Sequence, residues 1–268
     1  MVFVDSHVHI YDCFDIDLLL DSALENFRSA AQQDADGQPA CFMLLLTEGK
    51  KENWFRHTWK AVANSKDQQA SIAENWIAGK TDYPEVLVVF RKDLAENKLY
   101  IVAGRQVVTA ENIEVLGLLS RKSVSDGLSL TETITSLQQA GAIPVLPWGV
   151  GKWIGARGKK IEYLLENEDL KIYLGDNGGR PCLWPTPKLF LIAAGKNVAV
   201  LPGSDALPLK GEAGRAGSFG FFFDAPPGLH PFSALRRHLL SRHPKIIPFG
   251  HLQRSSRFVR NQLALRFS

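Results

Sequence analysis

The stretch Val2-Phe3-Val4-Asp5-Ser6-His7-Val8-His9 leads from a short apolar run directly into two histidines. The run predicts a buried strand, and side chains at positions i and i+2 of a strand point to the same side. Imidazole nitrogen binds divalent metals such as Zn²⁺ strongly, so His7 and His9 predict two corners of a metal site. The alternative for this motif alone is a pair of hydrogen-bonded histidines at a strand end.

A second strand end, near the other end of the chain, carries a further potential ligand. The apolar run Val198-Ala199-Val200-Leu201 predicts a strand, and Pro202-Gly203-Ser204 connects it to Asp205. Asp205 could instead cap the chain after the glycine, but the two histidines supply the partners that a metal ligand needs. We therefore expect Asp205 to bind the same metal as the histidines.

Length and composition are those of an ordinary globular protein. The chain has 268 residues, of which 45% are hydrophobic and 22% charged, and its net charge of +3 is too small to indicate nucleic acid binding. The three cysteines are widely spaced and predict no disulfide framework. There is no apolar run of about 18 residues and no signal-peptide pattern, so we expect no membrane partner and a cytoplasmic location.

The order of the predicted elements favours strands connected by helices. A capping box begins a helix at Ser129, and Gly141 follows the end of that helix. The predicted helices are 17–31, 129–140, 159–168 and 187–194. The predicted strands are 40–46, 86–91, 98–103, 106–109, 113–118, 143–146, 172–174 and 198–201. Residues 52–76 are predicted as helix or irregular cover. This alternation predicts a distorted TIM-like α/β barrel, a single domain over residues 1–268 with 210–268 as a C-terminal extension packed on it.

In such a barrel, functional side chains gather at the carboxyl ends of the strands. The residues predicted there are His7, His9, Glu48, Trp148, Lys152, Asp176 and Asp205. Imidazoles and carboxylates at one rim predict an active site. Asp176 also has a structural alternative, because Asp-Asn-Gly-Gly is typical of a tight turn.

Cationic residues lie in glycine-rich loops that follow predicted strands. The loop at 149–160 precedes a helix, an arrangement typical of anion binding, although a solvated surface loop is the alternative. Its cationic residues are Lys152, Arg157 and Lys159, and Arg180 and Arg215 lie beside glycines in two further loops. Basic segments at 233–243 and 253–260 predict either a solvated face or contact with a polynucleotide or phosphorylated partner.

The order of several short motifs resembles the PHP family, the polymerase and histidinol phosphatase metal-dependent phosphoesterases. The similar segments are Asp5-Ser6-His7-Val8-His9 for D-x-H-x-H, 104–109 for G-x-E-I-x-T, 113–117 for I-H-V-L-G, 128–146 for the helix and strand before A-H-P, and Gly203-Ser204-Asp205-Ala206 for G-S-D-A-H. The resemblance implies a PHP-type barrel with a phosphoesterase metal site. The amidohydrolase superfamily also begins with H-x-H and ends with a strand-end aspartate, and is the related alternative.

Several ligand positions of that family carry other residues here. They are Glu48-Gly49 in place of D-H, Gln106 in place of Glu, Glu114 in place of His, Pro147 or Trp148 in place of His, and Ala206 or Leu207 in place of the final His. The family's shell for up to three metals is therefore reduced. The resemblance implies one or two ions held by His7, His9 and Asp205, with Glu48, Asp15 or Glu114 as substitute ligands.

Two functions follow from the motifs. The first is a phosphoesterase-like hydrolase of a small anionic substrate that uses one or two divalent ions of Zn, Mn or Fe. The expected metal ligands are His7, His9, Asp205, Glu48 and Glu114; the expected catalytic residues are Asp205, Lys152 and Arg180; the expected substrate-binding residues are Lys152, Arg157, Asp176, Arg180 and Arg215. The second is a domain without catalysis or metal that binds an anionic ligand or partner through the same cationic loops.

Overall fold

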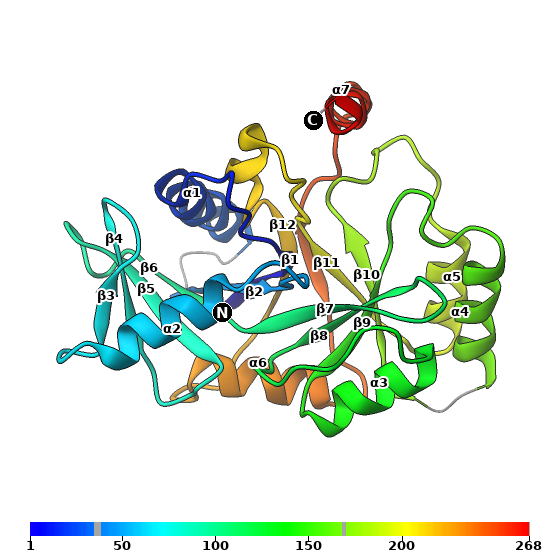
Figure 1. Ribbon diagram of the computed structural model, residues 1–268, viewed down its shortest axis with the longest axis horizontal. Coiled ribbons are helices and arrows are strands. Elements are labelled where there is room, and N and C mark those ends of the chain that lie inside the picture. The colour runs from blue at the N-terminus through cyan, green and yellow to red at the C-terminus, as the bar shows by residue number, and fades with distance from the viewer. Residues whose placement is uncertain (35–38, 168–169, 268) are drawn as a thin grey trace.

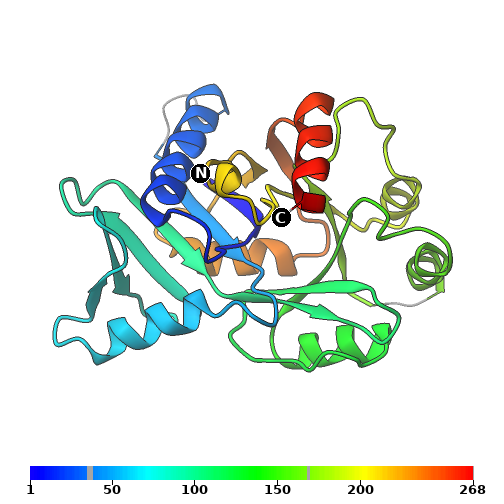
Figure 2. The same ribbon diagram turned by 45° about the horizontal axis from the view of Figure 1, so that its top comes forward.

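The computed structural model describes residues 1–34, 39–167 and 170–267, which form two open β-sheets and the helices around them (Figure 1, and turned by 45° in Figure 2). The strands are β1 (Val2–Val8), β2 (Cys41–Leu46), β3 (Gln69–Ser71), β4 (Trp76–Lys80), β5 (Val86–Arg91), β6 (Lys98–Val102), β7 (Gly104–Val108), β8 (Glu114–Leu118), β9 (Ile143–Pro147), β10 (Tyr173–Asn177), β11 (Val200–Gly203), β12 (Phe219–Phe223) and β13 (Ile247–Gly250). The helices are α1 (Ile16–Asp34), α2 (Trp54–Asn64), α3 (Leu130–Gln139), α4 (Ala156–Asn167), α5 (Lys188–Gly195), the 3-10 helix η1 (Lys210–Arg215), α6 (Pro231–Leu240) and α7 (Ser255–Phe267).

The expected closed, TIM-like barrel is wrong. The larger sheet has eight strands in the order β13-β12-β1-β2-β6-β5-β4-β3, and the smaller has five in the order β11-β10-β9-β8-β7. A TIM barrel needs parallel strands that close on themselves. Here β3 to β6 pair antiparallel, so they extend the sheet away from β2 instead of curving back to close it. On the other side of β1, β12 and β13 also pair antiparallel.

Residues 52–76, predicted as helix or irregular cover, form a helix and also strand structure. They form α2 and then β3, and β4 begins at Trp76. β3 has only three residues, of which two are exposed, so it lacks the apolar alternation by which a strand is recognised. The tertiary pairing with β4 makes it a strand.

The smaller sheet follows the sequence pattern more closely. Strands β9, β10 and β11 are parallel, and α4 and α5 connect them. The capping box at the start of α3 is present, because Ser129 Oγ accepts from Glu132 N and the Glu132 carboxylate accepts from Ser129 N at 3.0 Å. Gly141 follows the helix with φ of +76°, a left-handed conformation that glycine adopts at little cost.

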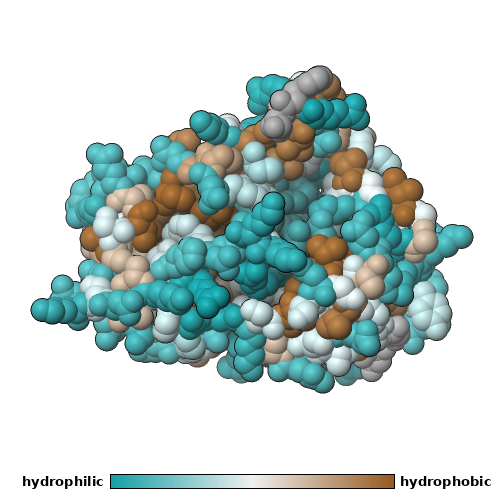
Figure 3. All heavy atoms as spheres, in the orientation of Figure 1, coloured by the Kyte–Doolittle hydropathy of each residue, from teal (hydrophilic) through white to brown (hydrophobic). Residues whose placement is uncertain are grey.

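The two sheets meet where β1 lies beside β11. Ser6 Oγ donates to Pro202 O at 2.8 Å, and Asp205 N donates to His7 O at 2.8 Å. Every residue of β1 is buried, so this junction lies inside the protein. On the face drawn in Figure 3, hydrophilic side chains predominate at the middle and hydrophobic residues gather in separate patches. Among the described helices, none has the length and apolar character needed to cross a bilayer.

Candidate metal centre

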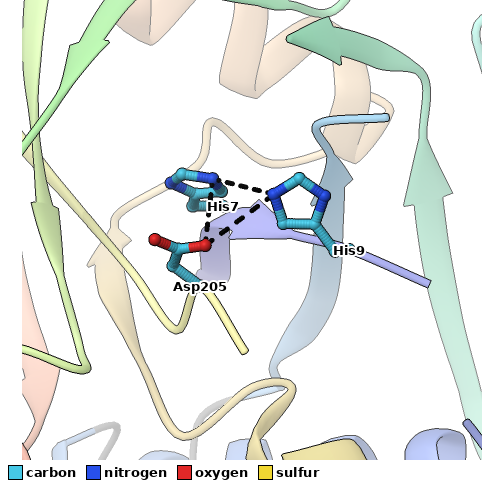
Figure 4. A group of neighbouring side chains, drawn as sticks. All are labelled: His7, His9 and Asp205. Carbon is cyan, nitrogen blue, oxygen red and sulfur yellow. Dashed lines mark hydrogen bonds and ion pairs between the residues drawn. The ribbon is translucent and has the colours of Figure 1, made fainter. Parts of the chain in front are cut away.

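His7, His9 and Asp205 converge at the junction of the two sheets (Figure 4). His7 Nε2 lies 3.2 Å from His9 Nε2, and Asp205 Oδ1 lies 3.4 Å from His7 Nε2 and 3.7 Å from His9 Nε2. Among the described histidine, cysteine and acidic residues, these three are the ones whose ligand atoms lie close enough together to hold a metal ion. Side chains that are far apart in the sequence therefore form one candidate ligand set.

The spacing of the three donor atoms fits a divalent ion. An ion with tetrahedral ligand bonds of about 2.0–2.1 Å separates its donor atoms by about 3.3 Å. The three observed separations, 3.2, 3.4 and 3.7 Å, lie close to that value. Two imidazoles and one carboxylate are also the donors found in catalytic zinc sites with an open fourth position.

The backbone around Asp205 is held in an uncommon conformation. Asp205 has φ of +42°, which costs energy for a residue with a Cβ atom, and its amide is fixed by His7 O. A Cβ atom added to Gly203 would lie 2.4 Å from the Cβ atom of His7. Only glycine therefore allows β11 to approach β1 closely enough to bring the aspartate to the histidines.

Asp5 anchors the same junction through its carboxylate. Its carboxylate is buried and accepts from Ser204 N and Gly217 N, both at 2.8 Å, and from His7 N at 3.2 Å. Burial raises the pKa of Asp5 to about 6, against the lowering effect of these hydrogen bonds. One carboxylate thus ties β1 to the loop after β11 and to the residues before β12.

The electrostatics of the ligands favour a bound cation. Burial lowers the pKa of His7 to about 3, against the opposing charge of Asp205, so its imidazole is neutral at neutral pH. Burial raises the pKa of Asp205, but nearby positive charge, including that of Lys152 and Arg215, outweighs burial and lowers it. A neutral imidazole and an ionised carboxylate are the forms that bind metal.

Two side chains outside the ligand set orient it. Glu52 Oε2 lies 2.9 Å from His9 Nδ1, the typical carboxylate–histidine contact behind a metal ligand. Asn177 Nδ2 donates to Asp205 Oδ2, which leaves Oδ1 directed to the histidines. Tyr11 also stacks on the His9 ring, with centroids 5.1 Å apart and an interplanar angle of 10°.

Glu48 and Glu114, expected as metal ligands, lie in other contacts. Glu48 Oε1 accepts from Phe55 N at 2.8 Å, and its Oε2 lies 3.5 Å from the Arg105 guanidinium. Glu114 accepts a hydrogen bond from Lys152 Nζ. Asp15, the third possible substitute, accepts from Leu18 N at the start of α1. None of these three carboxylates belongs to the described group that converges on the histidines.

A cavity of about 190 Å³ lies beside Asp205 and contains two of the expected cationic residues. Lys152 and Arg215 line it, together with Asn177 and Trp148. Arg215 is buried, and Glu212 Oε2 lies 3.7 Å from its guanidinium. Two positive side chains therefore face the space next to the ligand set.

The other expected substrate-binding residues lie elsewhere. Arg180 forms a bidentate ion pair with Asp176, with N–O distances of 2.9 and 2.7 Å, and both line a separate cavity of about 610 Å³. Arg157 donates to Gly151 O at 2.8 Å and so stabilises the glycine-rich loop. The structure brings Lys152 and Arg215 to the metal group, and does not bring Arg157, Asp176 or Arg180 there.

Glu52 and Asn177 were not predicted as site residues. Glu52 has no motif around it, and only the fold of the loop before α2 carries it to His9. Asn177 belongs to the Asp-Asn-Gly-Gly sequence that predicts a turn. Its place at the carboxyl end of β10 is the one signal that could have indicated a role in the site. Both residues act by orienting ligands, a role that needs spatial neighbours and leaves little trace in sequence.

Comparisons with known proteins relate this chain to solved structures alone. No protein-family model matches the sequence, and no curated protein sequence matches it. The fold is similar to that of PsfC from Pseudomonas syringae PB-5123, with a TM-score of 0.56, 16% identity, and coverage of 98% of this chain and 97% of that one. It is also similar to PfuEndoQ, a lesion-specific endonuclease from Pyrococcus furiosus, with a TM-score of 0.53, 12% identity, and coverage of 93% of this chain and 58% of that one. At these identities the likeness shows a shared fold.

Proposed function

We propose that this chain is a metal-dependent hydrolase of phosphate esters that uses one divalent ion held by His7, His9 and Asp205. The convergence of these three donor atoms within 3.2 to 3.7 Å of one another carries the proposal. The resemblance of the sequence motifs to the PHP phosphoesterases supports the phosphate ester as substrate. The fold shared with a lesion-specific endonuclease supports it too, because an endonuclease cleaves phosphate esters.

A divalent ion at this position would polarise a phosphoryl oxygen and make an attacking water more acidic. The chain's own residues bind and orient the substrate. Lys152 and Arg215 offer charge-assisted hydrogen bonds to phosphate oxygens in the cavity beside Asp205. Glu114 holds the Lys152 ammonium, and Glu212 lies beside the Arg215 guanidinium, so both cations are positioned before substrate binds.

Metal analysis of protein purified without a histidine tag tests the proposal. We expect a single equivalent of divalent ion per chain and loss of phosphatase activity on chelation. Asp205→Asn keeps the side-chain shape but removes the charged ligand, so it should weaken metal binding and abolish turnover. His57→Ala, an exposed residue of α2, should change neither. Equal loss of metal in both variants would contradict the proposed site.

The alternative is a binding domain without catalysis. Its support is the loss of family ligands at several positions, including Glu114 in place of His and Gln106 in place of Glu, together with the retained cations of the cavity. Capture of an anion by these cations needs no metal. Phosphorylated compounds would then bind in the presence of chelator, more weakly at high salt, and without product formation. Metal-dependent product formation excludes this alternative.

A further inference from the structure

A second cavity, of about 410 Å³, lies next to the one beside the metal ligands. Trp148 and Gly149 line both cavities, so the two spaces share a wall. Gly149 has no side chain there, and a Cβ atom at that position would lie 2.5 Å from the Lys152 side chain. A molecule whose phosphate is bound by Lys152 therefore lies next to the second cavity.

The walls of the second cavity are aromatic and apolar. Three indoles line it, those of Trp148, Trp153 and Trp184, and Ile154 adds an aliphatic side chain. Trp148 and Trp184 meet edge to face, with ring centroids 6.0 Å apart and an interplanar angle of 89°. Trp184 and Ile154 remain 41% and 71% exposed, which leaves apolar surface open to solvent at this place. Exposed apolar surface next to a polar centre is typical of a ligand site.

Two of the charged residues that line the second cavity form an ion pair, so their charges cancel. Lys188 Nζ lies 2.6 Å from Glu162 Oε1, and both residues line the cavity. Lys159 also lines this cavity. The cavity beside Asp205 contains the cations Lys152 and Arg215 together with the carboxylate of Glu212. The second cavity therefore differs from its neighbour in the indoles of Trp153 and Trp184, which suit it to an uncharged ring.

We propose that the cavity formed by Trp148, Trp153, Ile154 and Trp184 binds an aromatic ring in the alcohol part of the substrate. This inference rests on the proposed function, because it places the phosphate of the same molecule at the metal centre. Trp184 is the main determinant of ring binding, because it is the more exposed of the two indoles that meet edge to face. The substrate class is thereby narrowed to phosphate esters of alcohols that carry an aromatic ring.

The experiment compares benzyl phosphate with propyl phosphate, whose leaving alcohols are of similar acidity. In the metal-loaded protein, Trp184→Ala should raise KM for benzyl phosphate about tenfold, since aromatic pairing and burial of one ring supply roughly that factor. KM for propyl phosphate should stay unchanged. Ile154→Ser, at a position open to solvent, should act in the same direction without disturbing the fold. Trp59→Ala is the matched control, because Trp59 lies under Arg121 and lines neither cavity.

Binding of the non-hydrolysable analogues benzylphosphonate and propylphosphonate, measured by calorimetry, separates this inference from the proposed function. Stronger binding of the benzyl compound that is lost in Trp184→Ala supports the ring site even when neither ester is hydrolysed; that outcome would refute only the hydrolase. Hydrolysis of both esters with equal efficiency, unaffected by Trp184→Ala, would overturn the ring site and leave the hydrolase standing.

Discussion

Replacing Glu52 by glutamine tests how His9, a proposed metal ligand, is oriented. Glu52 Oε2 lies 2.9 Å from His9 Nδ1, and the other ring nitrogen, Nε2, faces His7 and Asp205. The carboxylate therefore fixes the ring orientation and the tautomer in which Nε2 is free to bind metal. Glutamine keeps the size and one acceptor oxygen but removes the charge.

The expected loss follows from this contact. A hydrogen bond to a charged group contributes about 1.5–3 kcal/mol, and each 1.4 kcal/mol corresponds to a tenfold change in affinity. Because the Glu52 side chain is 18% exposed, partial screening favours the lower part of that range. We expect Glu52→Gln to weaken metal binding about tenfold and Glu52→Ala, which loses the acceptor as well, to weaken it up to about a hundredfold.

Isothermal titration calorimetry of the metal-free protein with Zn²⁺ measures the effect. Glu25→Gln, an exposed carboxylate on α1, is the matched control and should bind as the wild type does. In chelator, Glu52→Gln should unfold close to the wild-type temperature, because glutamine keeps an acceptor oxygen for His9 Nδ1. An unchanged Kd for Glu52→Gln and Glu52→Ala, beside a weakened Asp205→Asn, would refute the orienting role.

Three further outcomes follow from other contacts. Gly203→Ala should lower the free energy of unfolding by about 3 kcal/mol in urea titrations, because its Cβ atom would lie 2.4 Å from that of His7. Ser129→Ala should cost about 1 kcal/mol in the same assay through loss of the capping box, and Ser129→Asp should restore most of it. Against the effect of burial, hydrogen bonds led by the one from Lys160 lower the pKa of Glu111 to about 2. The ionised Glu111 carboxylate therefore stabilises the folded protein, fully so above its unfolded pKa of about 4.5. This contribution to the free energy of unfolding, about 2 kcal/mol after screening, is lost as the pH falls toward 2. Glu111→Gln should remove this pH dependence.

The group of His7, His9 and Asp205 could be predicted from the sequence because these donor side chains lie at or after the ends of apolar strands. His7 and His9 share one side of a strand by geometry alone, and the Gly-Ser-Asp sequence ending at Asp205 repeats the pattern at a second strand. Glu48 follows an apolar strand in the same way, whereas Glu114 was expected as a ligand from the family resemblance. Their partners, the Phe55 amide and the Lys152 ammonium, come from other elements, and no local pattern shows that a carboxylate is already engaged.

The elements were easier to predict than their arrangement. Strand β5 has the bounds that alternation predicts, Val86–Arg91, and the capping box marks the start of α3. The closed barrel failed because alternation shows which residues face the core and says nothing about the neighbour with which a strand pairs. The antiparallel pairing of β5 with β4 and β6 is decided by turns and by long-range packing.

The junction of β1 with β11 makes the metal centre a reporter of complete folding. His7 and Asp205 are 198 residues apart in the sequence, and the hydrogen bond from Asp205 N to His7 O forms only after the two sheets have come together. Such distant contacts are costly in chain entropy and form late. A metal ion bound by both would stabilise only the fully assembled protein, so its concentration would shift the whole unfolding equilibrium rather than the stability of one sheet.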